Sequence, residues 1–474
     1  MRLNSFSWSI IFLLLACGRF APCSAAVDEK ENKPNIIVIF CDDLGWGDLG
    51  CFGNPIIRTP NIDRMASEGQ RWTQFYVAAP VCTPSRAALM TGRYPIRNGM
   101  TSDKRAVLFP DSGGGLPPEE ITLAEMLKEA GYATGIVGKW HLGHQPQYLP
   151  TAQGFDSYFG IPYSNDMDKL GGPGYMAEVR KDASYYPQIE HYNVPLMRNT
   201  EVIERPADQN TLTKRYTEEA IRFIEDHAAE PFFLYLPHSM PHIPLFASER
   251  FRGSSPRGLY GDVVEELDAS VGYILDTLRE LKLESKTLVV FSSDNGPCLS
   301  FETHGGSAGP LCAGKGTTFE GGMRVPTIFW WPGRIEPGTK QDVGSTLDFM
   351  ATFTSIANGE LPENRKLDSY DLSSVLFDGQ ESPRDTMFYW TNAQLHAVRR
   401  GSWKLHLKMR EAVNYGKEVE LAKPELYNIE QDISERYNLA DKLPEAVEIM
   451  LELVDEHLLD IDHHEDMLAI PLHK

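Results

Sequence analysis

Unbroken runs of apolar residues alternate with amphipathic segments along most of the chain. Six such runs are rich in β-branched and aromatic residues, as is typical of strands buried on both faces of a parallel sheet. They span 34–40, 74–78, 133–137, 231–236, 287–293 and 325–331. Between them lie segments with the helical spacing of apolar residues, at 59–69, 122–131, 211–227 and 262–281. This alternation predicts an α/β fold in which helices cover both faces of a large mixed, mostly parallel sheet.

The pattern changes at about residue 381. Three short alternating segments, at 387–390, 395–398 and 403–407, predict a smaller antiparallel sheet, and a helical pattern at 444–459 would cover it. We therefore expect a large catalytic domain at 27–380 and a small C-terminal α+β subdomain at 381–474.

The long stretch 144–215 is rich in Tyr, Pro and Gly and has no clear period. Irregular stretches of this length in compact domains are usually functional. We expect loops that face the substrate there, with a plain surface excursion as the alternative.

The N-terminus has the order of a secretory signal peptide. Arg2 precedes an apolar run at 10–15, and small residues follow to Ala26, after which we expect cleavage. The segment ending at Cys17 also resembles a bacterial lipoprotein box, which would place a lipid on Cys17. We therefore expect a signal peptide at 1–26 and a secreted or periplasmic mature protein. No transmembrane segment is expected, because no apolar run approaches the length of a membrane span.

The overall charge narrows the class of partner. A formal net charge of −21 argues against nucleic acid. It does not argue against a small anionic substrate, because a local group of cations can override the field of the whole protein. The sequence contains no Asn-x-Ser/Thr glycosylation site, which favours a bacterial secreted protein over a glycosylated lysosomal one.

Polar side chains follow four of the predicted strands. They are Asp42 and Asp43, then Lys139 and His141, then His238 and His242, and finally Asp294 and Asn295. The carboxyl ends of parallel strands meet at one edge of a sheet, where α/β proteins bind ligands. The three carboxylates and one amide oxygen among these side chains suit Ca²⁺ and make zinc a poor candidate. Ordinary turn and helix-capping roles are the alternative for each residue by itself.

The segment Cys82-Thr-Pro-Ser-Arg86 enters an apolar, helix-like run. A helix N-terminus at this point could hold a nucleophile and an anion, whereas the alternative is a buried, inert thiol. The segment and the Leu-x-Thr-Gly-Arg that follows it resemble the signature of the type I sulfatases, in which this Cys is oxidised to formylglycine. Five further segments also resemble the family, at 42–45, 138–143, 241–244, 293–296 and 314–322. Their residue patterns are most similar to the arylsulfatase A and N-acetylgalactosamine-6-sulfatase branches.

The resemblance implies an alkaline-phosphatase-like fold and a role for each matching residue. One Ca²⁺ would be held by Asp42, Asp43, Asp294, Asn295 and an oxygen of modified Cys82. Arg86 would steady the hydrated formylglycine, Lys139 and Lys315 would bind sulfate oxygens, and His141 and His242 would move protons. A formylglycine-generating or sulfatase-maturating enzyme is implied as a partner. His238 and His304 receive no role.

We therefore expect a sulfuric ester hydrolase that acts on a sulfated carbohydrate, with a galactose or N-acetylgalactosamine sulfate favoured. One alternative is a phosphate or phosphonate monoester hydrolase of the same superfamily, since phosphate and sulfate esters need similar binding groups. Another is an inactive protein that binds sulfated glycans, although a pure binder has no need of Cys82. The sugar, the sulfated position, exo or endo action and the oligomeric state stay open.

Overall fold

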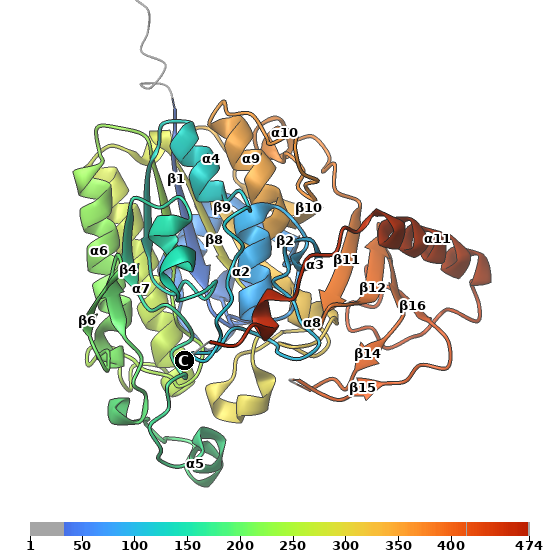
Figure 1. Ribbon diagram of the computed structural model, residues 1–474, viewed down its shortest axis with the longest axis horizontal. Coiled ribbons are helices and arrows are strands. Elements are labelled where there is room, and N and C mark those ends of the chain that lie inside the picture. The colour runs from blue at the N-terminus through green and yellow to red at the C-terminus, as the bar shows by residue number, and fades with distance from the viewer. Residues whose placement is uncertain (1–32, 414, 473–474) are drawn as a thin grey trace, which may run out of the picture.

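The structure, a computed structural model, describes residues 33–413 and 415–472 (Figure 1). The predicted signal peptide at 1–26 and Cys17 lie outside these residues. No helix of the described residues is long and apolar enough to cross a membrane.

A ten-stranded mixed sheet forms the centre of the large domain, in the order β10-β2-β9-β8-β1-β7-β3-β4-β5-β6. Its central strands β8, β1, β7, β3 and β4 are parallel, and β9 runs antiparallel to both of its neighbours. The strands are β1 (Asn35–Cys41), β2 (Gln70–Tyr76), β3 (Ala133–Val137), β4 (Ser157–Gly160), β5 (Leu196–Arg198), β6 (Glu201–Glu204), β7 (Phe232–Pro237), β8 (Thr287–Ser293), β9 (Arg324–Trp330) and β10 (Gly338–Ser345). The predicted large, mostly parallel mixed sheet is confirmed.

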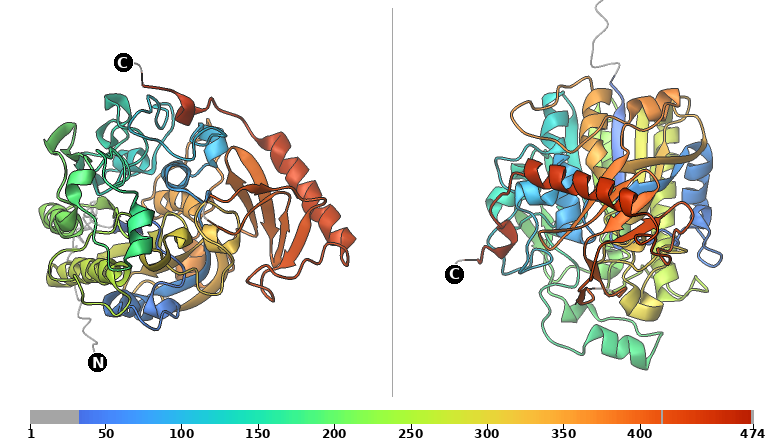
Figure 2. Two further views of the ribbon diagram at one scale, coloured as in Figure 1. Left: turned by 90° about the horizontal axis from the view of Figure 1, so that it is seen from below. Right: turned by 90° about the vertical axis from the view of Figure 1, so that its right-hand side faces the viewer.

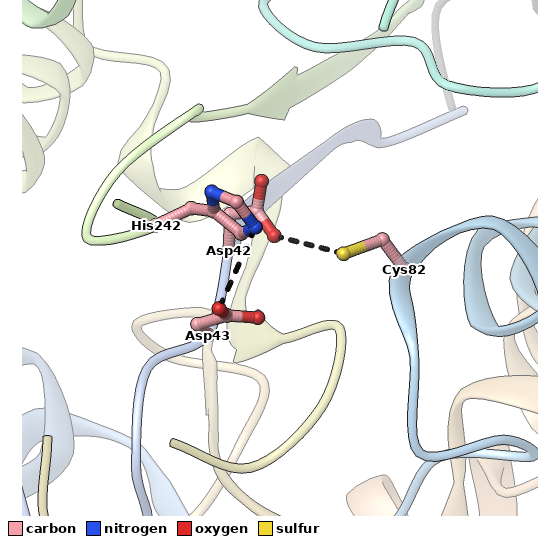
Figure 3. Close-up of side chains that lie close together, drawn as sticks. All are labelled: Asp42, Asp43, Cys82 and His242. Atoms are coloured by element: carbon pink, nitrogen blue, oxygen red, sulfur yellow. Dashed lines mark hydrogen bonds and ion pairs between the residues drawn. The ribbon is translucent and has the colours of Figure 1, made fainter. Parts of the chain in front are cut away.

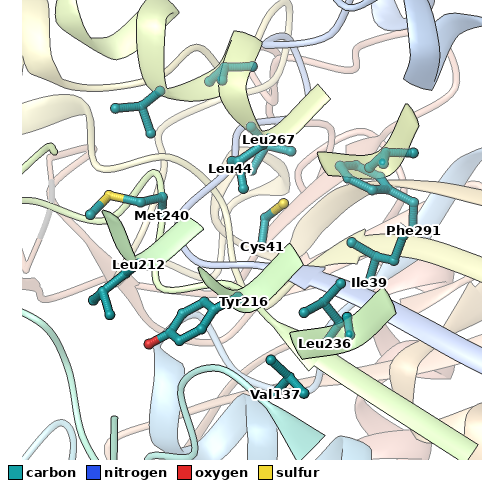
Figure 4. Close-up of a cluster of buried hydrophobic side chains, with 14 of the residues drawn as sticks. Ile39, Cys41, Leu44, Val137, Leu212, Tyr216, Leu236, Met240, Leu267 and Phe291 are labelled. Carbon is teal, nitrogen blue, oxygen red and sulfur yellow. The ribbon is translucent and has the colours of Figure 1, made fainter. Parts of the chain in front are cut away.

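Helices cover both faces of this sheet. The helices are α1 (Pro60–Glu68), α2 (Cys82–Thr91), α3 (Pro95–Asn98), α4 (Leu123–Glu129), α5 (Tyr175–Lys181), α6 (Leu212–Asp226), α7 (Leu259–Glu280), α8 (Glu320–Met323), α9 (Phe349–Ile356) and α10 (Ser373–Asp378). Successive residues of β1 point to opposite faces: Ile39 and Cys41 pack with α6 and α7 (Figure 4), whereas Val38 and Phe40 pack with α4 and α9. β1 therefore lies between two apolar layers, which explains its unbroken apolar sequence.

The prediction for 144–215 was wrong in part. β4, β5 and β6 from this stretch extend the large sheet, and α5 lies in the excursion between β4 and β5 (Figure 1). These strands have only three or four residues, too few for a period to show, and most of β6 is exposed. The strand predicted at 74–78 also begins earlier, at Gln70.

The C-terminal region forms a four-stranded antiparallel sheet, in the order β11-β12-β13-β16, beside a two-stranded hairpin. The strands are β11 (Thr386–Thr391), β12 (Gln394–Arg400), β13 (Trp403–His406) and β16 (Glu425–Asn428), with β14 (Met409–Arg410) and β15 (Glu418–Val419) in the hairpin. Helix α11 (Pro444–Asp460) covers the sheet, where His457 stacks on Phe388 at 3.6 Å between ring centroids. After α11 the chain returns to the large domain (Figure 2). There Gly113 N donates to Ile470 O.

Candidate active site

The residues predicted from the strand ends meet at one edge of the large sheet. Asp42 and Asp43 follow β1, Lys139 follows β3, His242 follows β7, and Asp294 follows β8. Cys82 begins α2 and points toward this group (Figure 3). The donor atoms of Asp42, Asp43, Cys82 and His242 all lie within 4.8 Å of one another, an arrangement that could hold a metal ion.

Cys82 is buried between the carboxylate of Asp42 and the ammonium of Lys315. Its Sγ donates to Asp42 Oδ1 at 3.3 Å, and Lys315 Nζ lies 3.3 Å from the same sulfur. Burial raises the pKa of the Cys82 thiol well above its usual value, and the charge of Asp42 raises it further. The thiolate is the nucleophilic form of cysteine, so this environment disfavours an unmodified Cys82 as a nucleophile.

Two oxygens of the site are buried without a hydrogen-bond partner among the described residues. They are Asp43 Oδ2 and Asn295 Oδ1. Asn295 Nδ2 donates to Asp43 Oδ1 at 2.7 Å, which leaves its carbonyl oxygen as the open atom. Buried polar atoms without partners are uncommon, and carboxylate and amide oxygens are ligands of hard cations. The open oxygens therefore fit a bound cation.

Asp294 and Arg86 form a pair beside this group. Asp294 Oδ1 accepts from Asp43 N at 3.1 Å, and Oδ2 accepts from Arg86 Nε at 3.0 Å and Nη2 at 2.7 Å. Burial raises the pKa of Asp294 to about 7, and the charge of Asp42 adds to that effect. Arg86 also donates to Lys139 O at 3.3 Å. Its guanidinium is thus fixed by Asp294 and by the backbone that carries Lys139.

Lys139 and Lys315 each pair with one of the adjacent aspartates. Lys139 Nζ lies 2.5 Å from Asp42 Oδ2, and Lys315 Nζ lies 2.7 Å from Asp43 Oδ1. Burial alone would raise the pKa of Asp42, but Lys139 and other nearby cations lower it well below its usual range. Burial alone would lower the pKa of Lys315, but Asp43 raises it well above its usual value. A charged Lys315 can bind an anion in a site with little water.

The two predicted histidines lie on different sides of the site. His242 Nε2 is 3.8 Å from Asp43 Oδ2, and its Nδ1 is 2.5 Å from Ile243 O. Burial lowers the pKa of His141 well below its usual value, and Lys139 contributes to the shift. Since a carbonyl can only accept, His141 Nε2 donates to Leu108 O at 2.9 Å. His141 Nδ1, which is buried without a hydrogen-bond partner among the described residues, is then an open hydrogen-bond acceptor.

Two residues of the site escaped the sequence prediction. Ser164 Oγ accepts from Lys139 Nζ at 3.2 Å, and Asn165 Oδ1 lies 3.2 Å from His242 Nδ1. Both follow β4, so the strand-end rule applies to them, but β4 was too short to be recognised. Of the histidines without a predicted role, His238 lies 3.4 Å from Ser270 Oγ of α7, and His304 Nδ1 lies 2.7 Å from the hydroxyl of Tyr175 in α5.

Known proteins match the chain over nearly all of its length. The family model described as sulfatase matches residues 34–359, and the model for the C-terminal region of aryl-sulfatase matches 382–471. Arylsulfatase A of Bos taurus is 41% identical over 457 residues, which cover 91% of this chain and 88% of that protein. N-acetylgalactosamine-6-sulfatase of Canis lupus familiaris is 43% identical over 416 residues, which cover 84% and 75%.

A solved structure gives the same result. The crystal structure of Ps i-CgsB in complex with k-i-k-neocarrahexaose has a TM-score of 0.76 and 32% sequence identity, and the match covers 91% of this chain and 94% of that chain. The large mixed sheet, its helical layers and the small antiparallel sheet define an alkaline-phosphatase-like fold. Within that class the chain belongs to the sulfatase family, and the protein is a sulfatase.

Proposed function

We propose that the protein removes sulfate from a sulfated carbohydrate and that residue 82, as formylglycine, is the nucleophile. The observation that carries the proposal is the position of Cys82 Sγ, 3.3 Å from both Asp42 Oδ1 and Lys315 Nζ. An oxygen in place of this sulfur would lie next to the oxygens suited to a cation and next to an ammonium suited to sulfate. The attacking oxygen and the positive charges that stabilise the sulfate group would then lie together in one buried site.

Formylglycine explains why this position is not simply a serine or a cysteine. The raised pKa of the Cys82 thiol makes it a poor nucleophile. A hydrated aldehyde carries two hydroxyl groups on one carbon, so that one can attack sulfur and the other can lose a proton to expel sulfate once the alcohol has left. A formylglycine-generating or sulfatase-maturating enzyme would be needed to make it from Cys82.

The metal would be one Ca²⁺ ion held by Asp42, Asp43, Asp294, Asn295 and an oxygen of residue 82. The unpartnered Asp43 Oδ2 and Asn295 Oδ1 support this assignment, and His242 lies close enough to Asp43 to contact the same site. Bound Ca²⁺ would supply positive charge that stabilises the developing charge of the reaction.

The remaining side chains bind the ester and move protons. Lys139 and Lys315 would bind sulfate oxygens, whose negative charge grows as the leaving oxygen departs. His242 would give a proton to the departing alcohol. His141, neutral and with Nδ1 free to accept, would take the proton of the second hydroxyl. Arg86 would act on the hydrated formylglycine while it holds Asp294 in place.

The favoured substrate is a galactose or N-acetylgalactosamine sulfate. Similarity to N-acetylgalactosamine-6-sulfatase and to the structure with bound k-i-k-neocarrahexaose supports this choice. Export through a signal peptide at 1–26, to the periplasm or the exterior of a bacterial cell, is part of the same proposal, because such polysaccharides lie outside the cell.

Paired substrates test the function. We expect 4-nitrophenyl sulfate to be hydrolysed with a much higher kcat/KM than 4-nitrophenyl phosphate, and a screen of defined sulfated saccharides should then identify the sugar. A preference for the phosphate or for a phosphonate monoester would favour the alternative hydrolase. Binding of sulfated glycans without any turnover, by protein with unmodified Cys82, would favour the inactive binding protein.

A further inference from the structure

A second group of buried charges lies where the C-terminal sheet meets the large domain. Lys404 of β13 is fully buried, and its Nζ lies 2.9 Å from Glu320 Oε1 and 3.0 Å from Glu435 Oε1. His406 Nε2 lies 2.7 Å from Glu435 Oε1. Glu320 is the first residue of α8, which belongs to the large domain and lies beside the C-terminal sheet (Figure 1). We call Glu320, Lys404, His406 and Glu435 the interdomain charge group.

The carboxylate oxygens of this group are all engaged. Glu320 Oε2 accepts from the hydroxyl of Tyr76 at 2.5 Å, and Glu435 Oε2 accepts from Glu320 N at 2.7 Å. Burial alone would raise the pKa of Glu320, but Lys404 and the nearby arginines lower it to about 2, so the carboxylate is charged. Paired charges without access to water hold a fixed geometry, because no water molecule can replace either charge as a hydrogen-bond partner.

The interdomain charge group contacts the segment that leads to Cys82 and the segment that carries Lys315. Tyr76 ends β2, and the chain then runs through 77–81 to Cys82. Glu320 directly follows the loop 314–319, which contains Lys315. These two segments also bond to each other, since Gly316 N donates to Pro80 O at 2.9 Å. A single lysine of the C-terminal sheet is therefore linked, through two side chains, to the segments of Cys82 and Lys315.

The backbone of α8 packs tightly against the loop that carries Lys315. Gly321 N donates to Cys312 O at 2.7 Å, on the far side of the Lys315 loop. A Cβ on Gly321 would lie 2.1 Å from Ala313 O, and one on Gly322 would lie 2.1 Å from Thr317 O. Because the α8 backbone packs this closely on the loop, a shift of α8 must shift the loop as well.

We propose that Lys404 is a positioning residue for the active site. Through Glu320 and Tyr76 it fixes where the Lys315 ammonium and residue 82 lie relative to the sulfate ester, although Lys404 itself does not touch the substrate. The proposal rests on the proposed role of Lys315 in sulfate binding. A displacement of about 1 Å in a catalytic group can lower the rate about a hundredfold, so the loss of this link should appear in turnover as well as in stability.

The test compares Lys404→Met with a control that breaks a similar link elsewhere. Arg384 is also buried and joins the C-terminal region to the large domain, with Nη2 2.5 Å from Asp348 Oδ1, just before α9. Both Lys404→Met and Arg384→Met should lower the midpoint of thermal unfolding. Well below those midpoints, kcat for 4-nitrophenyl sulfate should fall about a hundredfold in Lys404→Met and stay within about twofold of wild type in Arg384→Met. The Kd for inorganic sulfate should rise only in Lys404→Met.

Equal kcat and equal sulfate affinity in the two variants would overturn the proposal. If Lys404→Met does not fold, Glu320→Gln replaces it, because the amide keeps the size of the side chain and removes the charge that pairs with Lys404. A folded Glu320→Gln with wild-type kcat and wild-type sulfate Kd would overturn the proposal as well. Wild-type protein that hydrolyses neither 4-nitrophenyl sulfate nor any saccharide of the screen would instead refute the proposed function, and the sulfate Kd alone would then decide the role of Lys404.

Discussion

The candidate active site, which we call the strand-end site, and the interdomain charge group both bury several charges, but they differ in how their oxygens are bonded. The strand-end site is built from Asp42, Asp43, Cys82, Asp294 and Asn295 with Lys139 and Lys315. In the interdomain charge group, each carboxylate oxygen of Glu320 and Glu435 has a donor or a cation beside it. In the strand-end site, Asp43 Oδ2 and Asn295 Oδ1 have no hydrogen-bond partner among the described residues. The fully bonded carboxylates of Glu320 and Glu435 hold two parts of the protein together. The open oxygens beside the buried Cys82 are instead able to bind a ligand. Burial of charge alone therefore does not mark a functional site; open carboxylate and amide oxygens beside a candidate nucleophile do.

Removal of the Cys82 side chain should have the largest effect on activity. We expect Cys82→Ala to lower kcat at least about a thousandfold, because no other group of the site can attack sulfur. The midpoint of thermal unfolding should change little, since Ala fits the space and both aspartates keep their lysine partners. A variant that retains a substantial share of wild-type turnover, measured with 4-nitrophenyl sulfate, would remove residue 82 from the reaction.

Removal of the metal tests the open oxygens directly. Chelation should lower activity about a hundredfold or more, and added Ca²⁺ should restore it more fully than Mg²⁺, because Ca²⁺ accepts an uneven set of oxygen ligands. Ca²⁺ should also raise the midpoint of thermal unfolding, since it binds the folded form. Full activity in a sample shown by elemental analysis to be free of metal would contradict the assignment.

Acid should act on the C-terminal region through a paired but neutral group. Burial lowers the pKa of His457 to about 3, and the neutral ring accepts from Trp390 Nε1 at 3.1 Å. This folded-state pKa is below the unfolded value of about 6.5. The unfolded chain therefore binds the extra proton first, and stability is lost as the pH falls below about 6.5, by up to about 1.4 kcal/mol per pH unit.

A series of denaturant unfolding curves between pH 7.5 and pH 5 would measure this slope. The variant His457→Gln keeps an acceptor for Trp390 and removes the titrating group, so its slope should be shallower than that of wild type. Identical slopes would show that His457 does not contribute. His238 and His396, whose pKa values burial also lowers to about 3, should account for part of the slope that remains.

Much of the strand-end site could be predicted from the sequence, because two independent signals agreed there. Long buried strands placed Asp42 and Asp294 at one edge of a sheet, and the motif around Cys82 gave them a common chemistry. Ser164 and Asn165 could not be placed, since β4 is too short to show a period. The bond from Arg86 to Asp294 joins residues 208 positions apart, and no local pattern reports such a distance.

The interdomain charge group shows a different limit of sequence reasoning. Lys404 and Glu435 belong to residue types that are almost never fully buried unless they are paired. In the sequence Lys404 looks like a surface charge between two apolar residues, and Glu435 like a surface charge between Ser434 and Arg436. Their burial follows only from the way the C-terminal sheet docks on α8, which is a tertiary contact. The antiparallel sheet itself was predictable from its alternation, but what it does for the active site was not.

The chemical state of residue 82 is the most direct test of the account. Fully active enzyme should be digested, and the peptide that contains residue 82 should be examined by mass spectrometry alongside the same peptide from inactive preparations. The account predicts an aldehyde at residue 82, in a fraction of chains that rises in step with specific activity. Full activity with only unmodified Cys82 would contradict it.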